Sequence, residues 1–420
     1  MKKIISAILA ISITLALASC GESTLSTNDP GIEEPQSLLL IEIPDESNDH
    51  EEDAIVQEPF EGRIAIVTPA FGSTQYATYI AEHFIEKYGE DKIIHVTWPL
   101  LAGVEQDAMI KTVEELALDT DIRAIIVTHS FFATNNAFTK LRETRDDIFV
   151  VFCTPGFIVE EPNYSSQIAD LILATDLTGM APQIVQQAHK LGAETFVHYS
   201  FLRERHRDLQ TEIISLMEQK SSKLGIKFLD IDSFNLWDES SFGESLHDDV
   251  SAVVEKYGND TAFYSVDAII HVDLLRAVLS ARAIYPHTFH SHDFLTVARV
   301  LGVCVVVSRY EDGSLRPREE IIADIRAALS EKDMLNRVSS WPVMDDKLLS
   351  YASVLYAVKW INGEVPREGI DVDVLRQLMI DYAGVNVTLT PFTDEFPYAE
   401  EGTGETFDNF FMVLMDFITF

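Results

Sequence analysis

Short apolar runs alternate with amphipathic stretches along the chain from Arg63 onward. Four such runs, each of eight residues, are RIAIVTPA (63–70), KIIHVTWP (92–99), RAIIVTHS (123–130) and IFVVFCTP (148–155), and a shorter one is LILATD (171–176). Amphipathic stretches with helical spacing separate the first four runs. Near-continuous Val and Ile runs separated by helices are typical of a parallel sheet covered on both faces.

The same alternation restarts near residue 192. Apolar runs at 195–201, 227–234 and 261–267 each lead into a helical stretch, and VCVVVS (303–308) follows a loop rich in His and Tyr. Helices are then expected at 318–332 and 347–363, and at least the second returns to the first series. The sequence therefore predicts an α/β fold of two Rossmann-like lobes with parallel sheets, joined by a hinge. The N-terminal lobe spans 62–191 and is completed by about 340–420, and the C-terminal lobe spans 192–335.

The first twenty residues have the features of an export signal. Lys2 and Lys3 precede an apolar run at 4–17 that is shorter than the roughly 20 residues needed to span a bilayer. The sequence LASC at 17–20 resembles a bacterial lipobox, which implies a signal peptide at 1–20 and acyl chains on Cys20. We expect an extracytoplasmic, lipid-anchored protein on the cell membrane. The alternative is an ordinary secreted protein with an incidental cysteine.

Charge excludes one class of partner. The chain has a formal net charge of -37, and residues 21–60 contain twelve Asp or Glu and no Lys or Arg. Such a stretch cannot bury enough apolar surface to offset chain entropy, so 21–60 is predicted to be an acidic disordered tether. Nucleic acid is not expected as a partner, because phosphate binding needs clustered Lys and Arg.

Polar and aromatic residues end the predicted strands. Open α/β sheets bind ligands outside the carboxyl ends of their strands, so a gap between the two lobes is the expected ligand site. The candidate ligand-binding residues near these ends are Phe71, Gln75, Trp98, His129, Ser130, Thr154, Tyr199, Ser200, Asp267 and Trp341. The alternative for each hydroxyl residue is that it caps the helix that follows.

Three arginines follow the strand at 195–201, namely Arg203, Arg205 and Arg207. Cations at the start of a helix oppose its dipole, so other groups should offset them. They pair either with carboxylates of the protein or with an anionic group of a ligand. Arg203 lies nearest to the strand end and is the candidate for ligand contact.

The loop YPHTFHSHDF brings His287, His290, His292 and Asp293 close together in sequence. Imidazoles and a carboxylate suit Zn or Ni, but the spacing matches no closed metal site. The loop either binds metal, lines the ligand gap with His292 as a contact residue, or lies on the surface. No metal or cofactor is included in the predicted site.

Catalytic motifs are missing from the sequence. It contains no Gly-x-Ser-x-Gly elbow, no phosphate-binding Gly-Lys-Ser/Thr loop and no His-Glu-x-x-His. We therefore do not expect an enzyme, although a hydrolase assembled from His129, Ser130 and a carboxylate stays an alternative. Cys153 and Cys304 lie in apolar runs and read as buried thiols rather than a disulfide.

Five segments carry a resemblance to a known family. IHVTWP, KLGAETFVHYSF, KSSKLGIKFLDI, VVEKYGNDTAFYSVD and FDNFFMVLMDFITF together resemble the DUF3798 family of bacterial lipoproteins, from Arg63 to the last residue. The resemblance implies a two-lobed fold of the type I periplasmic-binding kind. It supplies no ligand and no site residues, and the loop YPHTFHSHDF departs from the pattern expected of the family.

The sequence as a whole predicts a solute-binding protein. It would capture a small polar ligand between two lobes, act as a monomer, and deliver the ligand to an ABC-type permease or a membrane sensor. The alternative is a regulatory or structural lipoprotein that keeps the fold without binding a solute. In that case side chains or the C-terminal tail would fill the gap.

Overall fold

A computed structural model describes residues 59–70, 74–99, 106–154, 162–200, 208–232, 242–266, 270–288, 292–303, 316–395, 397–398 and 402–420. The signal sequence, Cys20 and nearly all of the acidic tether lie outside these residues. In the described part of the chain, no helix combines the length and the apolar character needed to cross a membrane.

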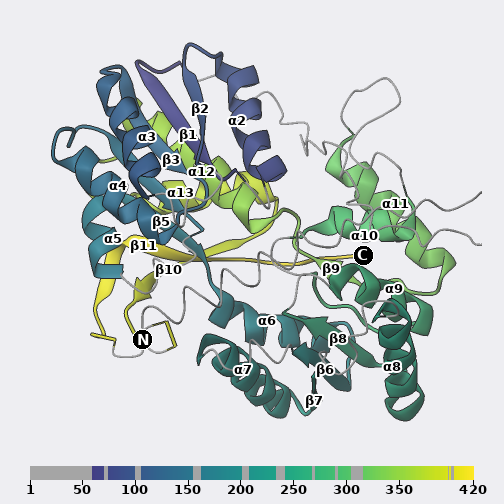
Figure 1. The fold of residues 1–420 in the computed structure, drawn as a ribbon. Coiled ribbons are helices and arrows are strands. Elements are labelled where there is room, and N and C mark those ends of the chain that lie inside the picture. Colours follow the sequence, from purple (N-terminus) through teal and green to yellow (C-terminus); the bar gives the residue numbers. More distant parts are fainter. Residues whose placement is uncertain are drawn as a thin grey trace, which may run out of the picture. The chain divides into compact units, whose positions relative to one another are not determined.

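Seven strands form the larger sheet, in the order β10-β11-β5-β4-β3-β1-β2 (Figure 1). Their bounds are β1 (Arg63–Thr68), β2 (Ile93–Thr97), β3 (Ile122–Val127), β4 (Phe149–Cys153), β5 (Leu171–Thr175), β10 (Val387–Thr393) and β11 (Thr406–Met415). Strands β1 to β5 run parallel; Ile66 of β1, for example, lies between His95 and Ile126. Most residues of β1, β3, β4 and β5 are buried on both faces, which explains why their sequences are almost continuously apolar.

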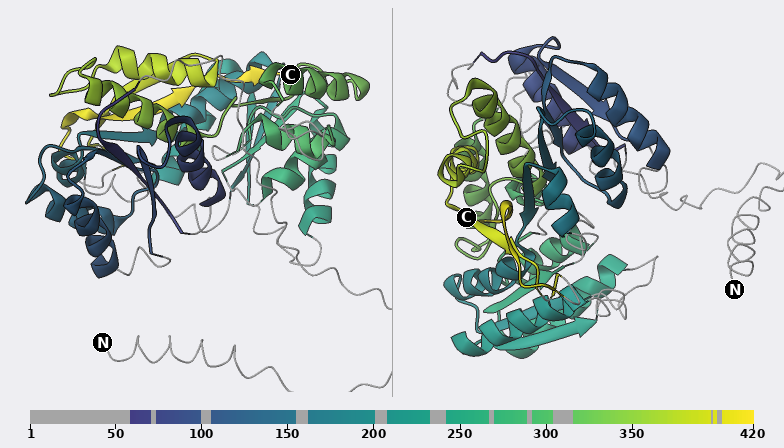
Figure 2. Two further views of the ribbon diagram at one scale, coloured as in Figure 1. Left: turned by 90° about the horizontal axis from the view of Figure 1, so that it is seen from above. Right: turned by 90° about the vertical axis from the view of Figure 1, so that its left-hand side faces the viewer.

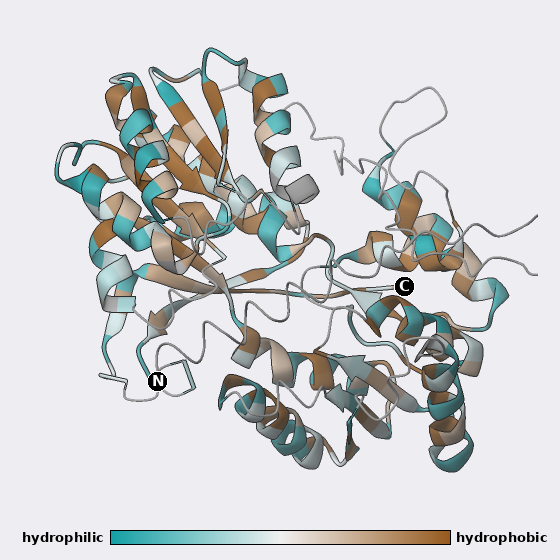
Figure 3. Ribbon diagram, viewed as in Figure 1, coloured by the Kyte–Doolittle hydropathy of each residue, from teal (hydrophilic) through white to brown (hydrophobic). Residues whose placement is uncertain are grey.

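Helices cover both faces of this sheet (Figure 2). One face, with Ile64 and Ile126, packs against α2 (Thr74–Tyr88), α12 (Asp345–Asn362) and α13 (Val372–Ala383). The other face, with Val67 and Ile125, packs against α3 (Gln106–Leu118), α4 (Phe132–Arg142) and α5 (Pro162–Ile168). The strands of the larger sheet are mostly apolar along their length, while the helices alternate apolar and polar positions, as Figure 3 shows by colour.

The last long strand, β11, lies inside the larger sheet rather than at its edge. It pairs parallel with β5, where Phe410 lies opposite Ile172, and antiparallel with β10, where Val387 lies opposite Met415. The chain therefore returns to the first sheet after it has built the second. Helix α12, at the position of the helix predicted at 347–363, packs on β3 and β4.

Three parallel strands form the smaller sheet, in the order β7-β6-β8. They are β6 (Thr195–Ser200), β7 (Lys227–Asp232) and β8 (Thr261–Ser265). The helices that pack around them are α6 (Leu177–Lys190), α7 (Asp208–Leu224), α8 (Phe242–Tyr257), α9 (His271–Ala281), α10 (Phe294–Leu301) and α11 (Arg318–Glu331). Two short strands, β9 (Ser339–Ser340) and β12 (Ile418–Thr419), pair with each other.

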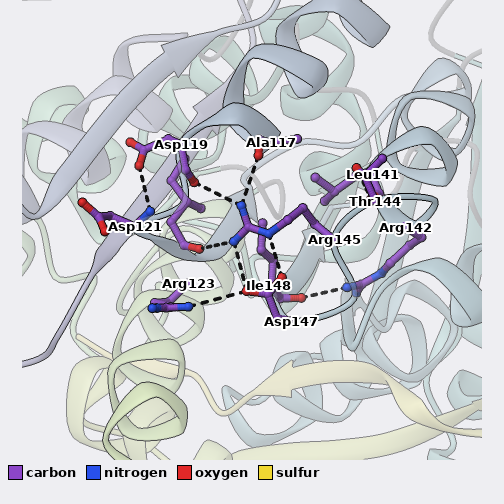
Figure 4. Close-up of polar contacts among 11 residues, drawn as sticks. Ala117, Asp119, Asp121, Arg123, Leu141, Arg142, Thr144, Arg145, Asp147 and Ile148 are labelled. Carbon is purple, nitrogen blue, oxygen red and sulfur yellow. Dashed lines mark hydrogen bonds and ion pairs between the residues drawn. The ribbon is translucent and has the colours of Figure 1, made fainter.

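Two arginines close the amino-terminal edge of the larger sheet (Figure 4). Arg145 donates to the backbone carbonyls of Ala117, Asp119 and Ile122 at 3.0–3.2 Å and to the carboxylate of Asp147 at 2.7 and 3.0 Å. Arg142 donates to the carbonyls of Ile148 and Ile168 at 2.8 and 2.9 Å and to the Asp170 carboxylate at 2.7 Å. All three guanidinium nitrogens of each arginine thus have protein acceptors. At this edge, the two arginines therefore hold the ends of helices against the starts of strands.

The predicted α/β fold class with parallel sheets is confirmed. The first five strands follow the order 2-1-3-4-5 of doubly wound sheets, and the smaller sheet repeats its first three positions. The predicted strand at 303–308 lies almost wholly outside the described residues. The division into an N-terminal lobe and a C-terminal lobe that move about a hinge stays a prediction.

Candidate functional site

The carboxyl ends of β1 to β5 place polar side chains along one edge of the larger sheet. The Thr68 hydroxyl lies 2.9 Å from Nε2 of His95, which joins β1 to β2. Thr128 donates its hydroxyl to the Val67 carbonyl at 3.2 Å, and Ser130 donates to the Cys153 carbonyl at 3.0 Å. These hydroxyls therefore bond to neighbouring strands, which differs from the helix capping considered as the alternative for such residues.

Helix α12 brings two carboxylates to this edge. Asp345 and Asp346 lie in its first turn, where a negative charge is favourable next to the partial positive charge of the helix end. Thr175, at the end of β5, donates to Asp345 Oδ2 at 2.6 Å, and Thr154, after β4, donates to Asp346 Oδ1 at 2.8 Å. Asp345 is only 3% exposed. The start of α12 is therefore fixed against the ends of β4 and β5.

His129 lies beside these carboxylates. Burial lowers the pKa of its imidazole, and the charge of Asp345 opposes that effect. Its ring centroid is 5.0 Å from that of Phe131. Nδ1 is buried and has no hydrogen-bond partner among the described residues. A buried polar atom without a partner costs about 1–3 kcal/mol, so an additional donor or acceptor at this nitrogen would stabilise the protein.

Thr154 has a backbone conformation that threonine rarely adopts. Its φ is 45°, in the left-handed region, where a β-branched side chain is strained. Such strain is found most often at ligand sites and persists only where the surrounding structure holds it. Here the hydrogen bond from its hydroxyl to Asp346 is one contact that holds it.

Two neighbouring groups of α12 and β4 complete the described edge. Lys347 is buried, and its Nζ lies 5.0 Å from the ring centroid of Tyr79. The Cys153 thiol lies 3.3 Å from the Ser353 hydroxyl, and burial raises its pKa to about 12. A thiol with this pKa is protonated at neutral pH and is not a nucleophile. Cys153 is a buried free thiol, as predicted.

Both predicted tryptophans are buried near strand ends. Trp98 follows β2 and donates its backbone N–H to the Thr68 carbonyl at 2.8 Å, with its ring in the core under α3. Trp341 lies between β9 and α12, and its ring is 4.8 Å from that of His287. In the described part of the chain neither indole Nε1 has an acceptor. Their contact with a ligand stays a prediction.

The candidates from the smaller sheet have protein partners. Tyr199 is fully buried and donates its hydroxyl to Asp249 at 2.6 Å; burial and this carboxylate raise its pKa. The Ser200 hydroxyl lies 3.5 Å from the Ile231 carbonyl. A pair that the sequence did not reveal, His198 and Asp230, is joined at 3.0 Å between β6 and β7. Direct ligand contact by Tyr199 and Ser200 stays a prediction.

The histidine loop is only partly described. His287 is buried, the His292 ring is 6.2 Å from that of His271, and Asp293 accepts from the Leu295 N–H at 3.0 Å as the N-cap of α10. His290 lies outside the described residues. Among the residues that are described, no three His, Cys, Asp or Glu side chains are placed to hold a metal ion.

Several other candidates also fall on undescribed positions. Phe71, Arg203 and Asp267 lie outside the described residues, as does the side chain of Gln75. The three arginines after β6 therefore stay a prediction. For the hydrolase alternative, Ser130 donates to the Cys153 carbonyl and not to His129. The structure does not form the nucleophile–base hydrogen bond that this alternative requires.

A groove lies at the matching edge of the smaller sheet. It has a volume of about 420 Å³ and lies between α8 and α9, lined by Gly243, Glu244, His247, Asp248, Asp273, Arg276 and Ala277. These helices follow β7 and β8, so their first turns begin at the carboxyl ends of those strands. Arg276 is paired with Asp273 at 3.0 Å. The described charges of this groove are mostly carboxylates, as they are at the start of α12.

Comparison with known proteins identifies relatives along much of the chain. The profile of a family described as "Protein of unknown function (DUF3798)" matches residues 63–339. Two uncharacterised proteins of Treponema pallidum (strain Nichols) are 32% identical over 137 residues and 26% identical over 167 residues. These matches cover 32% and 39% of this chain, and 60% and 76% of the relatives. The chain thus spans less than two thirds of the first relative.

A solved structure shares this fold. A crystal structure from Clostridium difficile 630, described provisionally as a transcriptional regulator, has a TM-score of 0.73 and 20% identity, and the match covers 86% of this chain and all of that one. A periplasmic ribose ABC transporter protein from Conexibacter woesei has a TM-score of 0.45 and 9% identity, covering 86% and 92%. With the sheet order described above, the predicted type I periplasmic-binding fold is confirmed.

Proposed function

The chain belongs to the DUF3798 family of proteins of unknown function, and from that starting point we propose that it is a solute-binding protein. It captures a small polar ligand at the carboxyl-terminal edge of the larger sheet, between the two predicted lobes. Parallel α/β sheets bind ligands at this edge, which supports the proposal from general principle. The fold is also one that solute-binding proteins use.

One observation carries the proposal more than any other. Asp345 and Asp346 are bonded to Thr175 and Thr154 at the ends of two strands, beside an imidazole whose buried Nδ1 has no partner among the described residues. Maintaining the strained Thr154 and a buried imidazole nitrogen that has no partner in the described part of the chain costs stability. The bonds to Thr175 and Thr154 fix the start of α12, but they do not satisfy the imidazole nitrogen, and a polar group of a ligand would bond to it.

The described charges favour ligands with hydrogen-bond donors. Asp345 and Asp346 on the larger sheet, and Glu244, Asp248 and Asp273 on the smaller one, are acceptors when ionised. Hydroxyl or amine groups suit such a site better than a carboxylate or phosphate does. Arg203 remains the candidate through which an anionic group would be bound instead.

Export and anchoring complete the proposal. The lipobox-like sequence supports a lipid on Cys20, and the acidic stretch at 21–60 would hold the folded body away from the membrane. An ABC-type permease or a membrane sensor is the expected partner, and the protein is expected to act by binding rather than catalysis. Mass spectrometry of the N-terminal peptide would detect acyl chains on Cys20, and an unmodified Cys20 in the membrane fraction would contradict the anchor.

The regulatory or structural alternative predicts that side chains or the C-terminal tail fill the gap. Of the described tail residues, 406–415 form β11, and Phe420 is buried with Val197 and Phe263 in the core of the smaller sheet. The ring of Phe417 lies 4.9 Å from that of His287 and 6.4 Å from that of Trp341, so one tail residue packs on a predicted ligand-binding residue. Binding of a solute distinguishes the proposal from this alternative.

A thermal-shift screen of metabolites tests the function. We expect neutral or amine-bearing polar compounds to raise the melting temperature of the protein, because a ligand that binds only the folded state stabilises it. The same compounds should have a much smaller effect on Asp345→Asn. If no compound in a broad library stabilises the protein, or if the shift is unchanged in the variant, the proposal fails.

A further inference from the structure

Arg318 joins helices that pack on different sheets. It is the first residue of α11, and the apolar face of this helix, with Ile321 and Ile325, is buried in the core of the smaller sheet together with Val197 and Phe263. Its guanidinium reaches the end of α13, which packs on α12 and one face of the larger sheet, in a hydrophobic cluster that also includes Phe196 and Tyr264 of the smaller sheet. The contact therefore links the two halves of the fold through side chain and backbone.

The guanidinium donates to two carbonyls that end α13. Nη2 of Arg318 lies 2.7 Å from the Tyr382 oxygen, and Nη1 donates to the Ala383 oxygen. The last carbonyls of a helix have no partners within the helix and carry its partial negative charge. A planar guanidinium can bond two such oxygens at once, which a lysine ammonium does less well.

Gly384 makes room for this contact. Its φ of 70° ends α13 in the left-handed conformation that glycine tolerates best. A Cβ at this position would lie 2.7 Å from Nη1 of Arg318. The glycine is therefore needed twice, once for the backbone turn and once for the approach of the arginine.

The buried charge of the Arg318 guanidinium would be costly without its hydrogen-bond acceptors. Burial lowers the pKa of the Arg318 guanidinium, while the nearby Glu319 and Asp293 carboxylates oppose that effect. Arginine keeps its proton in proteins, so the charge stays and must be compensated by acceptors. The two carbonyls of α13 supply such acceptors from the other half of the molecule.

We propose that Arg318 is an interlobe latch, which holds α11 on the end of α13 and must be released for the two lobes to move apart. Helices α13 and α12 connect the latch to the proposed ligand site. The Tyr382 ring stacks on Tyr351 of α12 at 4.0 Å, and α12 begins with Asp345 and Asp346. Movement of α13 is therefore transmitted to the helix that carries the site carboxylates. The latch does not depend on the identity of the solute.

A matched control lies two residues away. Arg316 lies just before α11 and pairs with Asp324 of that helix. Replacing Arg316 removes a cation from the same region and leaves the contact of Arg318 with α13 in place. Arg318→Met and Arg316→Met thus differ in the partner they lose.

Double electron–electron resonance between spin labels on the two halves tests the latch in the full chain without ligand. Leu118 of α3 and Ser251 of α8 are exposed label positions once replaced by Cys, and Cys153 is buried. Cys20 and Cys304 are replaced by Ser in every sample. We expect Arg318→Met to lower the ratio of the wild-type distance population to all others by roughly tenfold, which is the scale of a cation at a partly buried helix end. Arg316→Met should keep the wild-type distribution.

Arg318→Lys is a second, milder variant that tests the latch if Arg318→Met does not fold. It keeps the charge and loses the two-carbonyl geometry, so a smaller redistribution in the same direction is expected. Circular dichroism establishes which variants are folded. If the folded Arg318 variants show the wild-type distance distribution, or if Arg316→Met changes it equally, the latch is overturned.

Discussion

The two edges of the larger sheet differ in how their polar groups are satisfied. At the amino-terminal edge, Arg142 and Arg145 bond every guanidinium nitrogen to protein oxygens, and Figure 4 shows the bonds of Arg145. At the carboxyl-terminal edge, His129 retains a buried nitrogen without a partner among the described residues, and Thr154 is strained. The first edge has the properties of a structural joint, and the second those of a site prepared for another molecule.

The largest effect is expected at the structural edge. Arg145→Met leaves the carbonyls of Ala117, Asp119 and Ile122 without their donors, so the free energy of unfolding should fall by about 3 kcal/mol. Urea unfolding measures this change. Arg123→Met is the control, because the Arg123–Asp147 pair is 3.5 Å long and exposed, and it should change stability by less than about 0.5 kcal/mol. Equal losses in both variants would remove the distinction between these arginines.

At the carboxyl-terminal edge, substitutions should change the free energy of unfolding less and the affinity for a solute more. Asp345→Asn keeps an oxygen for Thr175 but removes the charge, so affinity for a stabilising solute should fall about tenfold or more while unfolding changes by less than about 1 kcal/mol. Calorimetric titration with a compound found in the thermal-shift screen measures the affinity. A large loss of stability with unchanged affinity would make Asp345 a structural residue.

Thr154→Gly should change the free energy of unfolding only slightly, which is a smaller effect than the loss of affinity expected for Asp345→Asn. Glycine relieves the strain of a φ of 45°, but the variant loses the hydrogen bond to Asp346, so the two changes offset each other within about 1 kcal/mol. Ser at this position keeps the hydroxyl and serves as the matched control. If Thr154→Gly strongly stabilises the protein without weakening solute binding, the strain has no role at the site.

The smallest expected effect is on the pH dependence of stability, because the titrating groups of the two edges act in different pH ranges. Burial lowers the pKa of His129 below its usual 6.5, so its contribution to stability is complete above pH 6.5 and is lost as the pH falls toward the lowered value. His95 acts in the same direction. Arg145 lowers the pKa of Asp147 below its usual 3.8, so that contribution is lost only below pH 3.8. Urea unfolding between pH 7 and 5 should therefore show a weaker pH dependence for His129→Gln and an unchanged one for Asp147→Asn.

Much of the carboxyl-terminal edge of the larger sheet could be predicted from the sequence, because the positions of its residues depend on local patterns. The apolar runs at 63–70 and 123–130 became β1 and β3, and the polar residues after them lie at the strand ends, as expected for parallel sheets. His129, Ser130 and Thr154 were found in this way. Their positions follow from where a strand stops, which is visible in the sequence.

The acidic half of the site could not be predicted in the same way. Asp345 and Asp346 read as ordinary acids in the first turn of a helix, and only the packing of α12 on β4 and β5 brings them to Thr154 and Thr175. Strand β11 was missed for the same reason, since its pairing with β5 joins segments far apart in the chain. Tyr199 shows that a position at a strand end does not by itself expose a side chain. It lies near the end of a predicted strand, but its ring is buried and its hydroxyl donates to Asp249.

Native mass spectrometry of the protein purified from its source tests the central claim most directly, with Asp345→Asn and Asp147→Asn expressed in the same cells. We predict that the wild-type protein and Asp147→Asn carry a non-covalent small-molecule mass, and that Asp345→Asn has lost it. Retention of the same mass by all three proteins would show that the solute binds elsewhere. A wild-type protein that carries no such mass, and that no metabolite stabilises, would contradict solute binding itself.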